Sequence, residues 1–177
     1  MCLFKSFYPD EIKDSAYVID YEALFMDGVR GIIYDIDNTL VMHGYPADKR
    51  AIELFERLKS IGYRVTLLSN NKEGRVKMFN DAVCVDYIYK AAKPMKKGYL
   101  KAMEIMGTDK NTTVFIGDQL FTDVWGAKRC GIRNILVKPI DPHEEIQIVL
   151  KRRLEAVVLF FYNRRKKYTR IQSQELR

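Results

Sequence analysis

From residue 30 onward, segments with the hydrophobic pattern of β-strands alternate with segments that have the hydrophobic pattern of α-helices. This alternation limits the folds that the chain can adopt. Five short runs are rich in β-branched and aromatic residues, as strands are, and cover residues 31–36, 63–69, 86–89, 112–117 and 133–139. Between them, apolar residues three and four positions apart predict amphipathic helices at residues 46–62, 72–82, 94–107 and 121–131. Strands that alternate with helices form parallel sheets. The sequence therefore predicts an α/β fold with a doubly wound parallel sheet of five strands.

Residues that commonly start and stop helices stand at the ends of these segments. Gly62 follows one predicted helix, and a second begins with Pro94 and is followed by Gly107. The pattern before residue 30 is weak, and we expect residues 1–29 to form a leader that packs on the main body. We therefore predict a domain over residues 1–140 that includes this leader, followed by a C-terminal basic amphipathic helix and tail over residues 141–177.

The composition excludes several classes of protein. There is no run of 18 or more apolar residues, so no transmembrane helix is expected. The N-terminal stretch "MCLFKSFYPDEIKD" lacks the apolar region of a signal peptide. The three cysteines, Cys2, Cys84 and Cys130, are scattered and have no metal-binding spacing, which favours a reducing, intracellular setting. We expect a cytoplasmic protein, or one held peripherally on the inner face of the membrane.

The reactive side chains of the sequence gather just after the predicted strands. Ligands of open α/β sheets bind at the carboxyl ends of strands, so these side chains are expected to form one site. In chain order they are Asp35, Asp37, Ser69, Asn70, Lys93, Asp118 and Asp123.

The chemistry of this set favours magnesium and phosphate. With oxygen ligands and no His or Cys at these positions, Mg²⁺ is favoured over zinc. The expected metal ligands are Asp35, Asp37, Asp118 and Asp123. The expected phosphate-binding groups are Ser69, Asn70 with the neighbouring backbone amides, and Lys93.

Four motifs together resemble those of the haloacid dehalogenase (HAD) superfamily of phosphotransferases. They are "DIDNTL" at residues 35–40, "SN" at 69–70, "KP" at 93–94 and "GDQLFTD" at 117–123. In the longer forms "SNN", "KAAKP" and "GDQLFTDV", with the leader sequence "YPDEI", they are similar to one family of the HAD IIIA subclass. That family comprises the bacterial YqeG and mitochondrial-type phosphatidylglycerophosphate phosphatases. The likeness covers most of the chain but leaves residues 163–177 unexplained.

The resemblance implies a Mg²⁺-dependent phosphatase that works through an aspartyl-phosphate. In this pattern Asp35 is the catalytic nucleophile, and Asp37 is the general acid and base. Asp118 binds Mg²⁺ together with Asp35 and the backbone carbonyl of Asp37. Lys93 is also catalytic, because it neutralises charge on the phosphoryl group, and Asp123 orients Lys93 or a metal-bound water.

The spacing of the motifs leaves no room for a cap domain over the site. Asp35 and Ser69 are separated by 33 residues, and Ser69 and Lys93 by 23 residues. Each interval holds one predicted helix and one predicted strand with little to spare. An open site suits a large or surface-bound phosphoester better than a small enclosed metabolite. This agrees with phosphatidylglycerophosphate, the substrate that the resemblance implies.

The net charge of +7 is concentrated at the C-terminal end, because residues 151–177 carry nine Lys or Arg and two acids. Residues 144–162 place apolar side chains at helical spacing, namely Ile146, Leu150, Leu154, Val157, Val158 and Phe161. A basic amphipathic helix favours peripheral contact with an anionic phospholipid membrane through residues 144–170. The alternative is a final helix that packs on the sheet and ends in a solvated tail.

Two other functions agree with the same sequence. The first is a soluble HAD phosphatase that acts on sugar phosphates, nucleotides or phosphoproteins. The second is a non-catalytic module that binds RNA or the ribosome through the basic tail.

Overall fold

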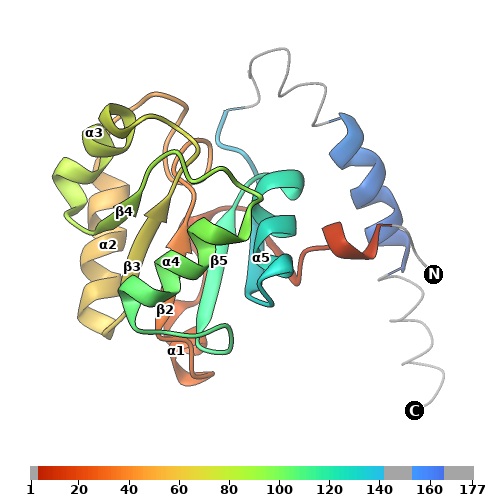
Figure 1. Cartoon of the computed structure of the whole chain (residues 1–177), viewed down its shortest axis with the longest axis horizontal. Coiled ribbons are helices and arrows are strands. Elements are labelled where there is room, and N and C mark those ends of the chain that lie inside the picture. The colour runs from red at the N-terminus through yellow and green to blue at the C-terminus, as the bar shows by residue number, and fades with distance from the viewer. Residues whose placement is uncertain (1–3, 142–152, 166–177) are drawn as a thin grey trace.

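The computed structural model describes residues 4–141 and 153–165, which form a parallel sheet with helices on both faces (Figure 1). The strands follow the order β1-β6-β5-β2-β3-β4, and every neighbouring pair is parallel. The strands are β1 (Glu11–Lys13), β2 (Gly31–Tyr34), β3 (Arg64–Leu68), β4 (Asp86–Ile88), β5 (Thr113–Gly117) and β6 (Arg133–Val137). The predicted doubly wound α/β fold is confirmed, with six strands where five were expected.

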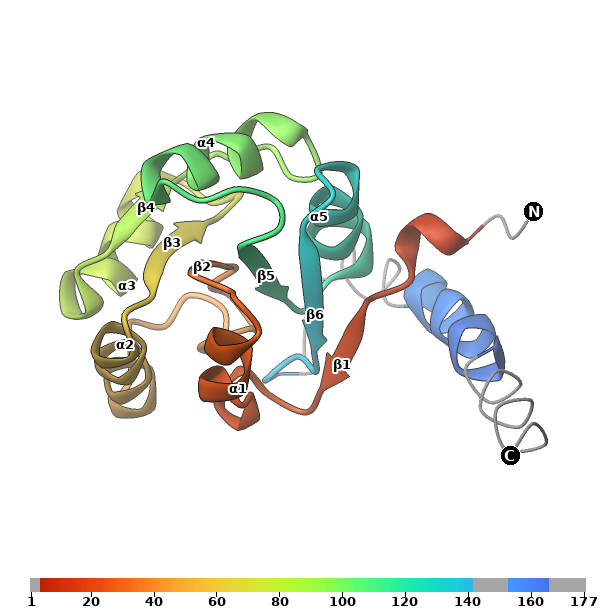
Figure 2. The same cartoon turned by 90° about the horizontal axis from the view of Figure 1, so that it is seen from below.

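The helices divide between the two faces of the sheet (Figure 2). One face is covered by α1 (Tyr21–Met26), α2 (Lys49–Ile61) and α3 (Glu73–Val83), and the other by α4 (Lys96–Met106) and α5 (Trp125–Arg129). The described residues also form three short helical turns, η1 (Lys5–Phe7), η2 (Ala16–Val18) and the π-helical turn η3 (Leu120–Val124). Each face therefore has its own apolar core, and the carboxyl ends of all six strands meet at one edge.

Helix α2 illustrates how local sequence determines an element. The Asp48 carboxylate accepts a hydrogen bond from the Ala51 amide at 2.9 Å and so caps the first turn. The helix buries the apolar positions that its period predicts. It ends at Gly62, whose φ of 104° lies in the left-handed region that glycine adopts at low cost.

The sixth strand comes from the predicted leader. In β1, Ile12 pairs with Leu136 of β6, and the salt bridge from Glu11 to Arg133 ties the two strands together. Just before β1, Asp10 accepts hydrogen bonds from the backbone and side-chain amides of Asn134 at 3.0 and 2.6 Å. The five-stranded prediction was wrong because three half-buried residues carry too little hydrophobic pattern to be recognised as a strand.

A helix over residues 153–165 packs against this end of the molecule (Figure 1). Val158 is buried in a cluster with Tyr8, Leu120 and Leu136. Four other apolar residues of the helix remain exposed: Leu154, Val157, Phe160 and Phe161. The predicted apolar stripe is thus divided, with Val158 in the core and three of its members facing solvent, while Ile146 and Leu150 lie outside the described residues.

The two connections that could hold a cap domain are short. The chain between β2 and β3 contains α2, and the chain between β3 and β4 contains α3. The expected absence of a cap therefore holds for the part of the chain that the structure describes. Among those residues, none of the helices combines the length and hydropathy needed to cross a bilayer.

Candidate active site

Three buried carboxylates meet at the carboxyl edge of the sheet. Asp35 directly follows β2, Asp118 follows β5, and Asp123 lies in η3. Each contributes a carboxylate oxygen to a group in which all the oxygens lie within 4.8 Å of one another. The parallel topology brings them together, because β2 and β5 are neighbours and end at the same level.

The Lys93 ammonium joins two of these carboxylates. Its Nζ lies 2.5 Å from Asp35 Oδ1 and 2.8 Å from Asp123 Oδ1, and all three side chains are buried. Burial by itself would lower the pKa of Lys93, but the charges of Asp123 and Asp35 outweigh it and keep this pKa above its ordinary value. Lys93 is therefore a permanent cation at this site.

The cluster carries more negative charge than Lys93 balances. Burial raises the pKa of Asp35 to about 7, Lys93 opposes this rise, and the neighbouring Asp123 charge reinforces it. One ammonium for three buried carboxylates leaves an excess of charge that is costly in a protein interior. A group of close oxygen ligands with excess negative charge fits a hard divalent cation such as Mg²⁺.

The loop that carries Lys93 is held to the end of β3. The Asn70 amide accepts a hydrogen bond from the Lys93 backbone N–H at 2.6 Å and donates to the Lys93 carbonyl at 3.2 Å. Lys90 and Ala92 both have positive φ, at 46° and 53°, which non-glycine residues rarely adopt. These contacts stabilise an unfavourable backbone that brings Lys93 to the carboxylates. The amide of Asn70, expected to bind phosphate, thus bonds the Lys93 backbone.

Ser69 ends β3 at the same edge of the sheet. Its side chain is buried, and its Oγ accepts a hydrogen bond from the Asn71 backbone N–H at 3.1 Å. A hydroxyl that accepts in this way can still donate its proton.

The side chain of Asp37 lies outside the three-carboxylate group. Its Oδ1 accepts hydrogen bonds from Arg75 Nε at 3.1 Å, Arg75 Nη2 at 2.8 Å and the Gly44 N–H at 2.9 Å. Its Oδ2 accepts a bond from Asn71 Nδ2 at 2.7 Å, and His43 Nδ1 lies 3.6 Å from Oδ1. Of the four predicted metal ligands, Asp37 is therefore the one whose carboxylate stands apart.

The segment from Gly117 to Asp123 is held by contacts on several sides. Thr39 Oγ1 donates to Asp118 Oδ1 at 3.2 Å, and the Gln119 N–H donates to Asp123 Oδ2 at 3.0 Å. A Cβ added at Gly117 would lie 2.5 Å from Asp123 Oδ2, so the close approach of this carboxylate requires glycine.

The helix over residues 153–165 also contacts this segment. The buried Glu155 carboxylate accepts a hydrogen bond from the Leu120 N–H at 2.7 Å, between Asp118 and Asp123. Glu155 thereby connects the C-terminal helix to the segment that carries two of the clustered carboxylates.

Sequence reasoning missed Arg75, Thr39 and Glu155. Thr39 lies inside the "DIDNTL" motif, so its position offered a clue. Arg75 and Glu155 stand among other charged residues on amphipathic helices, where a charged side chain usually faces solvent. Their partners are 38 and 35 residues away, and no local pattern reports such a contact.

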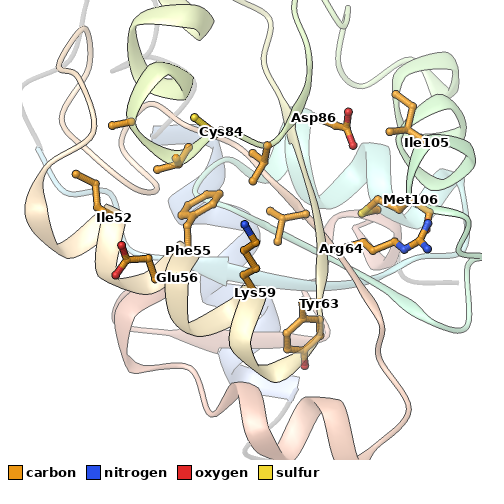
Figure 3. Close-up of a pocket in the computed structure, with 14 residues that line it drawn as sticks. Ile52, Phe55, Glu56, Lys59, Tyr63, Arg64, Cys84, Asp86, Ile105 and Met106 are labelled. Carbon is orange, nitrogen blue, oxygen red and sulfur yellow. The ribbon is translucent and has the colours of Figure 1, made fainter.

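A hollow of about 750 Å³ lies at the edge of the sheet opposite the carboxylate group (Figure 3). Phe55 and Lys59 of α2 line it together with Tyr63 and Arg64 at the start of β3 and Met106 at the end of α4. None of the predicted site residues is among its lining residues. The size of a cavity therefore does not locate the reactive groups of this protein.

The chain is similar to phosphatases along most of its length. It is 43% identical over 158 residues to the probable phosphatase YqeG of Bacillus subtilis, which covers 89% of this chain and 92% of that protein. It is 26% identical to the chloroplastic/mitochondrial phosphatidylglycerophosphate phosphatase 1 of Arabidopsis thaliana. That match covers 84% of this chain and 45% of the plant protein, so the chain spans less than half of it.

Solved structures share the fold at low sequence identity. The cobalt-bound deoxy-D-mannose-octulosonate 8-phosphate phosphatase of Haemophilus influenzae aligns with a TM-score of 0.53 at 14% identity, covering 64% of this chain and 81% of that one. A putative β-phosphoglucomutase from Thermotoga maritima aligns with a TM-score of 0.51 at 14% identity, covering 70% and 91%. The model of the haloacid dehalogenase-like hydrolases matches residues 42–131. The chain therefore belongs to the haloacid dehalogenase-like hydrolase family, as a phosphatase related to YqeG.

Proposed function

We propose that this phosphatase hydrolyses phosphomonoesters through an aspartyl-phosphate formed on Asp35, with Mg²⁺ as its metal. The observation that carries the proposal is the position of Lys93 between Asp35 and Asp123, with Asp118 completing the carboxylate group. A permanently charged ammonium beside the nucleophile attracts a phosphoryl group and neutralises charge that develops on it. Asp35, Asp118 and Asp123 are the carboxylates that would hold Mg²⁺, with Asp37 contributing through its backbone. When bound, Mg²⁺ supplies positive charge to the phosphoryl oxygens.

Each residue then has a defined task. An oxygen of Asp35 attacks phosphorus and forms a P–O bond, while the bond between phosphorus and the leaving alkoxide breaks. Asp37 donates a proton to that alkoxide and later takes a proton from water, whose oxygen attacks phosphorus and releases Asp35. Ser69 Oγ–H donates to a phosphoryl oxygen. Asn70 acts indirectly, because it holds the Lys93 backbone.

The contacts of Asp37 support its part in this scheme. Arg75, Asn71 and Gly44 fix its carboxylate two residues from the nucleophile, in a partly exposed position. A carboxylate that exchanges protons with a leaving group and with water needs such access. A fixed orientation also lowers the entropic cost of placing the acid at the leaving oxygen.

For the substrate, we propose phosphatidylglycerophosphate at a membrane surface. Three observations support this choice: the similarity to the Arabidopsis phosphatidylglycerophosphate phosphatase 1, the short connections that leave the site uncapped, and the apolar residues exposed on helix 153–165. That helix also exposes Arg153, Arg164 and Arg165, which suit an anionic lipid. We therefore propose peripheral membrane contact through residues 144–170, part of which lies outside the described residues.

The test measures phosphate release from phosphatidylglycerophosphate in mixed micelles and from a soluble aryl phosphate. Wild type is compared with Asp35→Asn, and Asp81→Asn serves as the control because Asp81 is an exposed acid on α3. We expect release that requires Mg²⁺, that Asp35→Asn abolishes and that Asp81→Asn leaves unchanged.

The other outcomes distinguish the alternatives. Faster turnover of the soluble ester than of the lipid would retain the chemistry and overturn the lipid substrate. Phosphate release that survives Asp35→Asn would overturn the aspartyl-phosphate. No release from either substrate, together with salt-sensitive RNA binding, would favour a binding module.

A further inference from the structure

Exposed apolar side chains stand on the loops that surround the candidate active site. The loop after β2 exposes Met42 and Tyr45, at 39% and 57% of their surface. The loop after β4 exposes Tyr89 and Met95, at 41% and 56%. Because all strands are parallel, both loops lie at the carboxyl edge, on the same side of the sheet as the carboxylate group. We name these four residues the apolar rim.

The loops that carry the apolar rim also contact the carboxylates of the candidate active site. Gly44, between Met42 and Tyr45, donates its N–H to Asp37 at 2.9 Å. Lys93, between Tyr89 and Met95, bonds Asp35 at 2.5 Å. The apolar rim therefore stands on the same loops that contact Asp37 and Asp35.

A shallow apolar hollow of about 200 Å³ adjoins the first loop. Its lining includes Met42, Tyr45, Pro46 and Ile140. The apolar surface thus extends beyond single exposed side chains, and its burial away from water would be favourable.

Exposed lysines accompany the part of the apolar rim that follows β4. Lys72, Lys90, Lys96 and Lys97 are all exposed in the segments that follow β3 and β4. Two acids of neighbouring segments, Asp48 and Glu73, are paired with Arg50 at 3.0 Å and Lys77 at 3.2 Å. These lysines therefore place exposed positive charge on the loops around the site, where Asp35, Asp118 and Asp123 are buried and Asp37 is paired with Arg75.

We infer that the apolar rim and its lysines form a membrane-contact surface, by which the catalytic edge lies against an anionic lipid bilayer. The inference rests on the proposed function, which places the phosphoester in a lipid headgroup. Met and Tyr side chains enter the interfacial layer, and lysines attract anionic headgroups. The charge favours this partner, because an anionic bilayer offers negative charge and apolar depth over the same area. The active site then opens toward the headgroups and needs no cap domain.

The first experiment measures binding to vesicles of phosphatidylglycerol and phosphatidylcholine that contain no substrate. Met95→Ser is compared with Met26→Ser, because Met26 is 86% exposed at the end of α1, on the opposite edge. Lys90→Gln/Lys97→Gln is compared with Lys59→Gln/Lys110→Gln, which removes the same charge from the opposite edge. We expect Met95→Ser to weaken binding several-fold and the Lys90/Lys97 double variant about ten-fold or more. The two controls should bind like wild type.

A second measurement locates the surface without relying on affinity. A nitroxide label on Met95→Cys or on Met26→Cys, in a chain whose own cysteines are replaced, reports immersion in the bilayer. We expect the label at residue 95 to be shielded from water on vesicles and the label at residue 26 to stay in water. A water-exposed label at residue 95 on bound protein, or equal losses in the rim variants and their controls, would overturn the inference.

These measurements do not depend on catalysis. Binding through the apolar rim without hydrolysis of phosphatidylglycerophosphate would overturn the proposed substrate and support the membrane-contact surface. Hydrolysis of the lipid with no contribution from the apolar rim would support the proposed substrate and overturn the membrane-contact surface. Met95→Ser should hydrolyse the soluble aryl phosphate at the wild-type rate, because the Met95 side chain is 56% exposed and has no charge with which to act on the phosphoryl group.

Discussion

Arg75 binds one oxygen of Asp37 through two of its nitrogens, Nε at 3.1 Å and Nη2 at 2.8 Å. Arg75 lies in the first turn of α3, and Asp37 follows β2, so the contact joins two elements that are 38 residues apart in sequence. Asn71 donates to the other oxygen at 2.7 Å. The carboxylate proposed as acid and base is thus oriented by side chains from a different part of the sheet edge.

Replacing Arg75 should lower turnover more than substrate binding. Arg75→Gln removes both arginine hydrogen bonds to Asp37 and leaves only Asn71 and the Gly44 N–H to orient it, so we expect kcat to fall by about 10 to 100-fold while KM changes little. Arg75→Lys should rescue only part of the loss, because an ammonium cannot reproduce the planar pair of donors. Steady-state kinetics on a soluble aryl phosphate would measure this. The control Arg57→Gln removes an arginine that pairs with Glu22, far from the site, and an equal loss there would contradict the assignment.

Gly117 should tolerate no side chain. The Cβ of Gly117→Ala would lie 2.5 Å from Asp123 Oδ2 and would force that carboxylate away from Lys93. We expect activity to fall about 100-fold, since displacements near 1 Å have effects of this size. Gly74→Ala is the matched control, because a Cβ there meets nothing within 4 Å. It should retain full activity and gain up to about 1 kcal/mol of stability. Near-normal activity of Gly117→Ala would show that the position of Asp123 matters little.

The metal-free protein should lose stability as the pH rises. Burial raises the pKa of Asp35 to about 7, whereas its ordinary value is 3.8. The folded protein therefore retains a proton that the unfolded chain has released, and the free energy of unfolding falls as pH increases from about 4 to 7. Urea unfolding in a chelator should show this slope for wild type, and a smaller slope for Asp35→Asn. Added Mg²⁺ should stabilise wild type more at pH 7.5 than at pH 5, because the cation binds the ionised carboxylate. If the free energy of unfolding changed equally with pH in both proteins, the raised pKa of Asp35 would be contradicted.

Glu155 should affect the site through the backbone of Leu120. In Glu155→Ala the Leu120 N–H loses its acceptor, and the segment between Asp118 and Asp123 should become more mobile. We expect faster hydrogen exchange at the Leu120 amide and about ten-fold weaker Mg²⁺ binding by calorimetry. Glu155→Gln keeps an acceptor for the Leu120 N–H and should lose less Mg²⁺ affinity than Glu155→Ala. The exposed Glu53 of α2 offers a control, and unchanged exchange at Leu120 in Glu155→Ala would refute the coupling.

Much of the architecture could be predicted because it is encoded locally. Asp48 and Gly62 delimit α2, and the apolar residues between them recur at helical spacing. The strands that lead into Asp35 and Asp118 are almost entirely apolar, which identifies them as buried central strands. Once parallel strands were expected, their carboxyl ends had to share one edge. The sequence alone therefore indicated that Asp35, Lys93, Asp118 and Asp123 would converge.

Other features depend on contacts between distant segments, which only the tertiary structure decides. Strand β1 forms because β6 offers it a partner, since three residues cannot form a strand by themselves. The division of the C-terminal apolar stripe depends on which helix face meets Leu120 and Leu136. Arg75 acquires its position only when α3 packs beside the end of β2. Hydrophobic spacing and capping residues indicate the secondary structure that one segment prefers by itself. The partner of a charged side chain depends instead on how distant segments pack against one another.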